Sequence, residues 1–289
     1  METQLDPPHP SGMALHLSTP VPDVLYHYTD QHGLLEIVRN AELWATSWDC
    51  LNDVEESYVL TKIAKRLLER RLRTETNGDS KKLLTYLLER TNLHPATYDI
   101  YVSSWSAARD DLSQWRAYSG PDTGYSLGMR GSTLKMLAEK SGGMLAPCIY
   151  DPVEQEAIVS EFIEHALKVG YDDDEIYWGD YRAFVLRYSA MFKDQAFSAE
   201  REWRIITKPN TYETACFRLG KSTLRTYKPV SLASVDRPGK SGIDVAEVVV
   251  GPSPSQELAA SKVFYLLRRY CNQHMSTPVS ASTIPYRSW

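Results

Sequence analysis

The chain has 289 residues, of which 43% are hydrophobic and 24% charged, and it carries a formal net charge of -5. This composition is typical of a soluble globular protein. The negative charge argues against tight, sequence-independent nucleic-acid binding, although it is compatible with a local basic groove. The sequence contains no run of about eighteen apolar residues, so we expect no membrane span. The four cysteines never form a C-x-x-C pair, which disfavours a zinc site and a disulfide framework and fits the reducing cytoplasm, where we expect the protein.

Residues 1–22 are rich in Pro, Ser and Thr and lack periodicity, so we expect a flexible N-terminal arm. Residues 23–289 predict one α+β domain, because no linker divides them and helices separate the strands without regular alternation. We expect a mixed, mostly antiparallel central sheet with surrounding helices. The predicted strands are 24–29, 42–47, 100–106, 125–129, 145–150, 202–207, a stretch up to about Leu232, 245–250 and 280–285. The predicted helices are 31–40, two within 54–92 separated at 77–79, 112–118, 153–169, 174–193 and 255–271.

The first predicted strand, 24–29, carries the first candidate site residues. Alternation places Tyr26 and Tyr28 on one face and His27 and Thr29 on the other. A single histidine on a strand is more often a hydrogen-bonded core residue than a catalyst. His27 is therefore a candidate site residue only if other polar side chains lie close to it.

Further polar and aromatic side chains lie near expected strand ends. They are Ser104 and Ser106 at the end of a strand, and Trp115, Arg116 and Tyr118 on the helix that follows. Serines also end ordinary strands, and aromatic residues at helical spacing more often pack in a core than form a stacking platform. The turn at Asn52 and Asp53 directly follows the second strand, so we expect it at the rim of the same cleft.

Glu200 and Glu202 are separated by one residue, just before or at the start of a predicted strand. In an extended segment both carboxylates point to one face, with Arg201 and Arg204 assigned to the other. Like charges raise each other's pKa and nearby guanidinium groups lower it. Such a pair suits a task in which an anion stabilises a cation or accepts a proton beside a sugar or base. The alternative is an edge strand with surface salt bridges.

Common catalytic motifs are absent from the sequence. It has no Gly-rich dinucleotide fingerprint, phosphate loop, His-Glu-x-x-His or Gly-x-Ser-x-Gly. Its seven histidines show no metal-ligand spacing, so we expect no metal.

Eight segments follow one another in a characteristic order. They are Leu-Tyr-His-Tyr-Thr (25–29), Glu-Leu-Trp-Ala-Thr (42–46), Leu-Asn-Asp (51–53), Ser-Trp-Ser (104–106), Leu-Ser-Gln-Trp-Arg-Ala-Tyr (112–118), Gly-Tyr-Ser-Leu-Gly (124–128), Glu-Arg-Glu-Trp-Arg (200–204) and Val-Val-Val-Gly-Pro (248–252). Together they resemble the bacterial family DUF2971 over nearly the whole chain after the arm. That family carries little assigned chemistry, so the resemblance implies a DUF2971-like α+β domain and almost no function.

The Tyr-His-Tyr-Thr opening, followed at once by a helix, is more distantly similar to the first motif of ADP-ribosyltransferase-like (DarT/PARP-type) domains, which include a nucleic-acid-modifying toxin branch. This resemblance implies an ADP-ribosyltransferase-like fold with NAD as substrate. His27 and Thr29 would hold the ribose and carboxamide, and Ser104, Ser106 or Tyr118 would line the nicotinamide pocket. Glu202, with Glu200 as the preceding acid, would support an oxocarbenium-like transition state.

Other candidates have supporting roles in the same scheme. Arg116 or Arg204 would hold the pyrophosphate through bidentate hydrogen bonds. Tyr28, Trp115 or Tyr118 would stack on nicotinamide or adenine.

Three functional hypotheses follow. The first is an NAD-dependent ADP-ribosyltransferase, as a toxin or anti-phage effector, that transfers ADP-ribose to a protein or nucleic-acid acceptor. The second is a non-catalytic module that binds or senses a nucleotide or peptide, because no strong nucleophile–base pair is present. The third is a metal-independent nuclease or glycoside-type hydrolase that uses Glu200 and Glu202. A same-face pair suits it poorly, since hydrolases need opposed carboxylates.

Overall fold

The structure is a computed structural model. It describes residues 10–51, 58–91, 98–119, 123–169, 184–220, 222–233, 242–271 and 277–286. Among these residues no helix combines the length and apolar character needed to cross a membrane.

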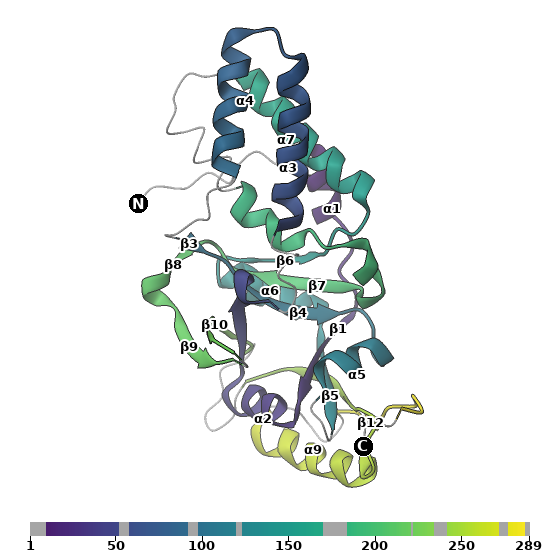
Figure 1. Cartoon of the computed structure of the whole chain (residues 1–289). Coiled ribbons are helices and arrows are strands. Elements are labelled where there is room, and N and C mark those ends of the chain that lie inside the picture. Colours follow the sequence, from purple (N-terminus) through teal and green to yellow (C-terminus); the bar gives the residue numbers. More distant parts are fainter. Residues whose placement is uncertain are drawn as a thin grey trace.

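A ten-stranded sheet runs through the middle of the molecule (Figure 1). Eight strands follow the order β12-β11-β5-β1-β4-β2-β10-β9, and β7 pairs with both β4 and β6. Pairing is antiparallel except between β11 and β12. The strands are β1 (Val24–Asp30), β2 (Glu42–Ser47), β4 (Tyr101–Ser106), β5 (Gly124–Arg130), β6 (Met144–Pro147), β7 (Glu202–Ile206), β9 (Cys216–Leu219), β10 (Leu224–Ser231), β11 (Val245–Val250) and β12 (Val279–Ala281). The predicted mixed, mostly antiparallel sheet is confirmed.

The sheet divides at β4, and this division creates the site described below. One edge of β4 pairs with β7 from Val102 to Ser106. The other edge is shared, because β2 pairs only at Tyr101 and Val102 and β1 pairs only at Ser106. Between these contacts, residues 103–105 face no strand on that edge. Polar backbone groups there are open to side chains or a ligand.

One face of the sheet is covered by α2 (Gln31–Asn40), α6 (Gly131–Lys140) and α9 (Gln256–Tyr270). Their apolar stripes pack on alternate strand residues such as Leu127 and Ile205, which are fully buried. Burying such stripes is the main stabilising contribution to the fold.

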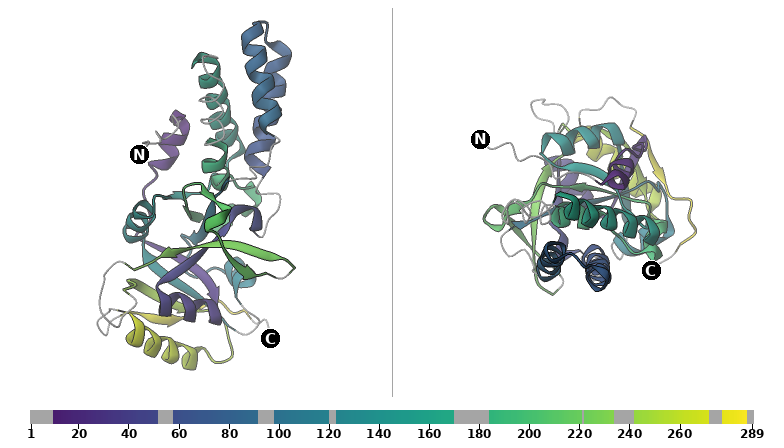
Figure 2. Two further views of the ribbon diagram at one scale, coloured as in Figure 1. Left: turned by 90° about the vertical axis from the view of Figure 1, so that its left-hand side faces the viewer. Right: turned by 90° about the horizontal axis from the view of Figure 1, so that it is seen from above.

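The opposite face carries two separate covers. The short helix α5 (Leu112–Tyr118) packs over β1. Helices α3 (Val59–Thr74), α4 (Gly78–Thr91) and α7 (Pro152–Val169) form a second core and project from one end of the sheet, as the left view of Figure 2 shows. The Arg66–Arg73 run lies on α3, where Arg66 and Arg70 reach Glu156 of α7 from the exposed surface. A second, two-stranded sheet joins β3 (Tyr98–Asp99) to β8 (Asn210–Thr211).

The expected N-terminal arm needs a correction, because part of it is a helix. Helix α1 (Ser11–Leu17) packs against α7, and Met13 is fully buried in the second core. The backbone N–H groups of Ser11 and Gly12 donate to the Glu161 carboxylate at 2.5 and 3.1 Å. A carboxylate from another helix thus satisfies the exposed N–H groups of this short helix, a partner that local sequence cannot reveal.

Two further predictions differ in extent. The helix predicted at 174–193 lies partly outside the described residues, and its described part ends in a 3-10 turn, Ser189–Met191. The segment predicted as a strand from 202 begins after another 3-10 helix, Gln195–Glu200, and Arg201 takes a left-handed conformation (φ 46°) between them. Glu200 and Glu202 are therefore not neighbours on one extended strand.

Candidate functional site

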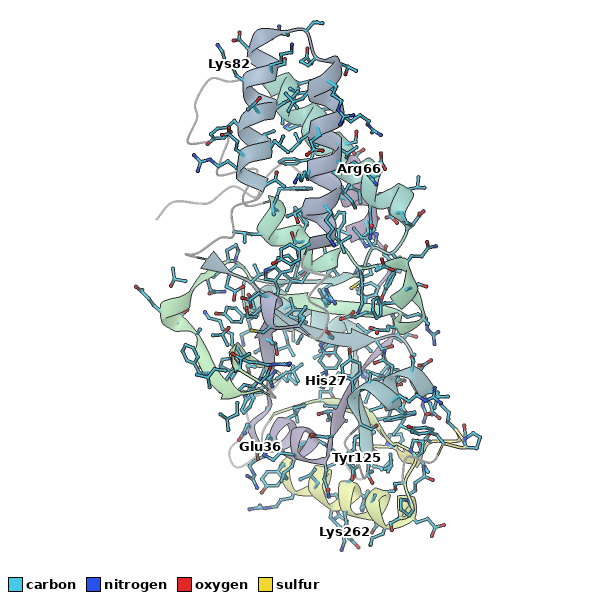
Figure 3. The ribbon with its side chains drawn as sticks, viewed as in Figure 1. His27, Glu36, Arg66, Lys82, Tyr125 and Lys262 are labelled. Carbon is cyan, nitrogen blue, oxygen red and sulfur yellow. The ribbon has the colours of Figure 1, made fainter. Side chains whose placement is uncertain are left out.

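A pocket lies where β1 and β4 separate, and its empty space of about 320 Å³ includes open solvent. Figure 3 shows His27 near the middle of the molecule, between the upper and lower parts of the sheet. The lining residues come from β1, β4, α5 and the start of β7: Tyr26, His27, Tyr28, Ser104, Trp105, Ser106, Gln114, Tyr118, Glu200 and Glu202. Seven of the eleven predicted site residues are among them.

His27 fills the gap in the sheet. Its Nδ1 lies 2.9 Å from the carbonyl oxygen of Ser104, and a carbonyl only accepts, so Nδ1 carries the proton. Burial lowers the pKa of His27 despite this hydrogen bond, which favours the neutral ring at neutral pH. In the neutral ring Nε2 is an acceptor, and no described residue donates to it. His27 can thus accept a hydrogen bond from a hydroxyl or amide of a ligand.

Ser106 holds the backbone that carries Glu200. Its hydroxyl donates to the Glu200 carbonyl at 2.7 Å and accepts from the N–H of Ala108 at 2.9 Å. The N–H of Ala107 also donates to the carbonyl of Arg201 at 3.0 Å. These contacts fix the left-handed turn between the two glutamates, so the Ser106 hydroxyl serves the protein rather than a ligand.

Lys193 joins both glutamates in a buried charge cluster. Its Nζ donates to Glu202 Oε2 at 2.5 Å and to Glu200 Oε2 at 2.7 Å. Arg204 forms a two-pronged pair with Glu202, at 2.8 and 3.0 Å, and also donates to the Ala190 carbonyl at 2.6 Å. The two cations and two carboxylates balance in charge, which permits their burial.

The cluster gives the two glutamates different environments. Glu202 is 5% exposed and is held by two cations, whereas the Glu200 side chain is 18% exposed and contacts only Lys193 through one oxygen. The other oxygen, Oε1, has no hydrogen-bond partner among the described residues. The pocket therefore presents one carboxylate that can still change partners.

Acid should weaken the fold through Glu202. Burial acts to raise the pKa of Glu202, but Arg204 and Lys193 outweigh it and hold the pKa at about 2, below the ordinary 4.5. Because the folded-state pKa is depressed, this carboxylate stabilises the protein above about pH 4.5 and loses that contribution as the pH falls toward 2. Between about pH 6 and about pH 3 we expect this group to lose about 2 kcal/mol of its contribution, measured by urea unfolding, and we expect a shallower acid dependence in Glu202→Gln. Parallel pH profiles would contradict this assignment.

Three more side chains in the pocket keep hydrogen-bonding capacity. The Ser104 hydroxyl, the Gln114 amide and the Tyr118 hydroxyl make no side-chain hydrogen bond to any described residue. Burial, then the Glu200 and Glu202 carboxylates, raise the pKa of Tyr118 to about 12, so its hydroxyl is a donor at neutral pH. With His27 Nε2 and Glu200 Oε1, these groups form a ring of unused donors and acceptors.

Four predicted site residues do not line the pocket. Arg204 is 2% exposed, and its guanidinium is held by Glu202 and Ala190, so the prediction that it binds pyrophosphate is wrong for this arrangement. It shares a face with Glu202 because the two are two apart on one strand. β7 is also an inner strand between β4 and β6, so the alternative of an exposed edge is wrong.

The other three lie around the pocket. Trp115 is 1% exposed, donates to Asp110 at 2.7 Å and packs edge-on against Tyr28, which makes it a core residue rather than a stacking surface. Arg116 is exposed and lies 5.3 Å above the Tyr286 ring. Thr29 is the second-last residue of β1 and lies beside Gly33 of α2. Asn52 and Asp53, predicted at the rim, lie outside the described residues.

Two side chains of the candidate site, Gln114 and Lys193, were not predicted from the sequence. Gln114 lies four residues before Tyr118, so a helix through 112–118 predicts that both share a face, and this spacing was an available signal. Lys193 carries no such signal, because the chain fold alone brings it between Glu200 and Glu202. Among the described residues no group of three or more His, Cys, Asp or Glu side chains could hold a metal ion.

The fold and pocket define a mixed α/β domain with a ligand-sized site at a division of its sheet. Residues 114–205 match the model of the family DUF2971, described as "Protein of unknown function". The match confirms the DUF2971 resemblance for this part of the chain, which includes most of α5, the charge cluster and most of β7. Comparison with curated proteins and with solved structures yields no significant match.

Proposed function

We propose that the pocket binds the nicotinamide riboside part of NAD and that the chain is an NAD-consuming ADP-ribosyltransferase. The observation that carries the proposal is the ring of unused hydrogen-bonding groups beside one available carboxylate, assembled from β1, β4, α5 and the start of β7. In this proposal the pocket receives the nicotinamide riboside, and the adenylate extends outside it.

The proposed roles follow the chemistry of each group. His27 Nε2 accepts a hydrogen bond from a ribose hydroxyl, and Gln114 or Ser104 forms a hydrogen bond with the carboxamide. As the bond between ribose and nicotinamide breaks, nicotinamide leaves with the electron pair and positive charge grows on the sugar. Glu200 stabilises that charge and takes the proton from the incoming nucleophile, whose lone pair forms the new bond to the sugar.

This scheme exchanges the roles that the sequence suggested for the two glutamates. Glu202 is enclosed by Lys193 and Arg204, so its charge is already compensated. We therefore assign it to positioning Lys193 and, through Lys193, Glu200. Glu200 lines the pocket and keeps one carboxylate oxygen without a partner among the described residues, so we assign it as the reacting carboxylate.

His27→Ala should weaken NAD binding about tenfold, because one hydrogen bond to the ribose is lost. Isothermal titration calorimetry with NAD measures this effect. His32→Ala removes an exposed imidazole on α2, outside the pocket, and should leave the affinity unchanged. Equal affinities of wild type and His27→Ala would remove His27 from the site.

A second candidate function is a non-catalytic nucleotide-binding or sensing module. The saturation of Glu202 by two cations favours it, because one of the two expected acids is already neutralised. Release of nicotinamide from NAD, assayed with and without cell extract as acceptor source, distinguishes the two functions. The transferase releases nicotinamide, and the binding module binds NAD without releasing it.

A further inference from the structure

The far end of the sheet, β2–β10–β9, carries an exposed pair of aromatic rings. Trp44 of β2 is 36% exposed, and its ring centroid lies 4.5 Å from that of Tyr227 on β10, with a 30° angle between the planes. The guanidinium of Arg218 on β9 lies 5.9 Å from the Trp44 ring and 6.0 Å from the Tyr227 ring. An exposed indole braced by a cation presents a flat surface suited to stacking.

Two arginines meet beside these rings with no acid between them. Arg218 and Arg225 are direct partners in the β9–β10 pairing, and like charges opposed across strands are destabilising. Neither forms an ion pair with any described residue. Nη2 of Arg218 donates to Thr46 at 2.6 Å, while its Nε is buried without a partner among the described residues. Opposed cations with unused donors are typical of a site that receives an anion.

The local charge agrees with an anionic ligand. Residues 208–231 hold five basic residues and one acidic residue in a chain of net charge -5. The basic character is therefore concentrated at this end of the sheet, where β8, β9 and β10 lie together at one side of the molecule (Figure 1).

The aromatic rings lie on the same sheet face as the candidate site. Tyr227 pairs with Thr46, and Thr46 pairs with Val102 of β4. Val102 shares a face with Ser104, which lines the pocket, because the two are two apart on one strand. Trp44 on β2 is thus one strand spacing from β4 and Tyr227 on β10 is two, lateral distances of about 5 and about 10 Å.

We propose that Trp44, Tyr227, Arg218 and Arg225 form a binding surface for single-stranded nucleic acid. The rings stack on bases and the arginines bind the phosphates, a combination that tolerates many sequences. The surface exists independently of the pocket chemistry. That it presents the acceptor strand to the pocket is an extension that rests on the proposed function.

Fluorescence anisotropy with labelled unstructured DNA and RNA strands of about twelve nucleotides tests the surface. Wild type should bind either strand, and Trp44→Ala should weaken binding about tenfold through the loss of stacking. Arg225→Gln should lower the slope of log affinity against log salt by about 0.7, because one phosphate contact is lost. Circular dichroism melting shows whether each variant folds. If Trp44→Ala does not fold, Arg225→Gln still tests the proposal.

Two control variants distinguish binding at this surface from the general effect of removing any charge or any exposed ring. Phe217→Ala removes a 64% exposed ring from the other face of β9. Lys82→Gln removes a cation from the projecting helix α4, away from the proposed binding surface. Both should bind like wild type. Strand binding unaffected by Trp44→Ala and Arg225→Gln, or binding of an acidic peptide or of mononucleotides alone, would overturn the proposal.

The anisotropy assay contains no NAD, so its outcome is independent of turnover. Strand binding without nicotinamide release would leave the surface in place and defeat the transferase. Nicotinamide release without strand binding would defeat the surface alone.

Discussion

Glu200→Gln is expected to lower the rate of nicotinamide release about 10²–10³-fold while leaving NAD affinity nearly unchanged. Glutamine keeps the shape of the side chain and its contact region near Lys193 but carries no charge to stabilise the ribosyl cation. The effect is therefore confined to the step in which charge develops. Steady-state rates of nicotinamide release, together with calorimetric NAD affinities, give the two quantities separately.

Two comparisons make this result interpretable. Glu36→Gln changes a partly exposed carboxylate of α2 that pairs with Arg39, outside the pocket, and it should leave both quantities at wild-type values. Unchanged turnover in Glu200→Gln would refute its role as the reacting carboxylate. A loss of turnover that is matched by an equal loss of NAD affinity would assign Glu200 to binding alone.

Lys193→Met is expected to lower the free energy of unfolding by about 3–5 kcal/mol at neutral pH, because it leaves two carboxylates without their shared cation. Lys193 is 4% exposed and contacts Glu200 and Glu202 at 2.7 and 2.5 Å. Its long stem is apolar, so methionine preserves most of the packing and isolates the effect of the charge. Urea unfolding measures the change.

The double variant Lys193→Met/Glu200→Gln tests the cause. It leaves Glu202 with its two-pronged Arg204 partner, so it should regain part of the stability lost in Lys193→Met. Lys82→Met, at an exposed position of α4, should change the free energy of unfolding by less than about 0.5 kcal/mol. An additive double variant would mean that Lys193 and Glu200 are not coupled.

Periodicity predicted most of the sheet, because each strand buries alternate residues in a pattern that a sequence displays. β1, β2, β4, β5, β7 and β11 all lie within one or two residues of their predicted positions. The helix α1 was not predictable in the same way. Its stability depends on Met13 reaching the second core and on Glu161, about 150 residues away, and neither contact leaves a local pattern.

The site was predictable where it depends on strand position and unpredictable where it depends on a turn. His27, Ser104 and Tyr118 line the pocket as predicted, because the sequence placed their strands and helix at the correct positions. Whether Glu200 or Glu202 faces a ligand depends on the left-handed conformation of Arg201, which no periodicity indicates. Arg204 does not bind a ligand as predicted, because it lies two residues from the buried Glu202 on the same strand face and pairs with that carboxylate.

The most direct test of the account is a crystal structure of Glu200→Gln with NAD, a variant expected to bind NAD without consuming it. The account predicts the nicotinamide riboside in the pocket between β1 and β4, with a ribose hydroxyl within hydrogen-bonding distance of His27 Nε2 and the carboxamide bonded to Gln114 or Ser104. NAD bound elsewhere on the molecule, with this pocket holding only water, would contradict it.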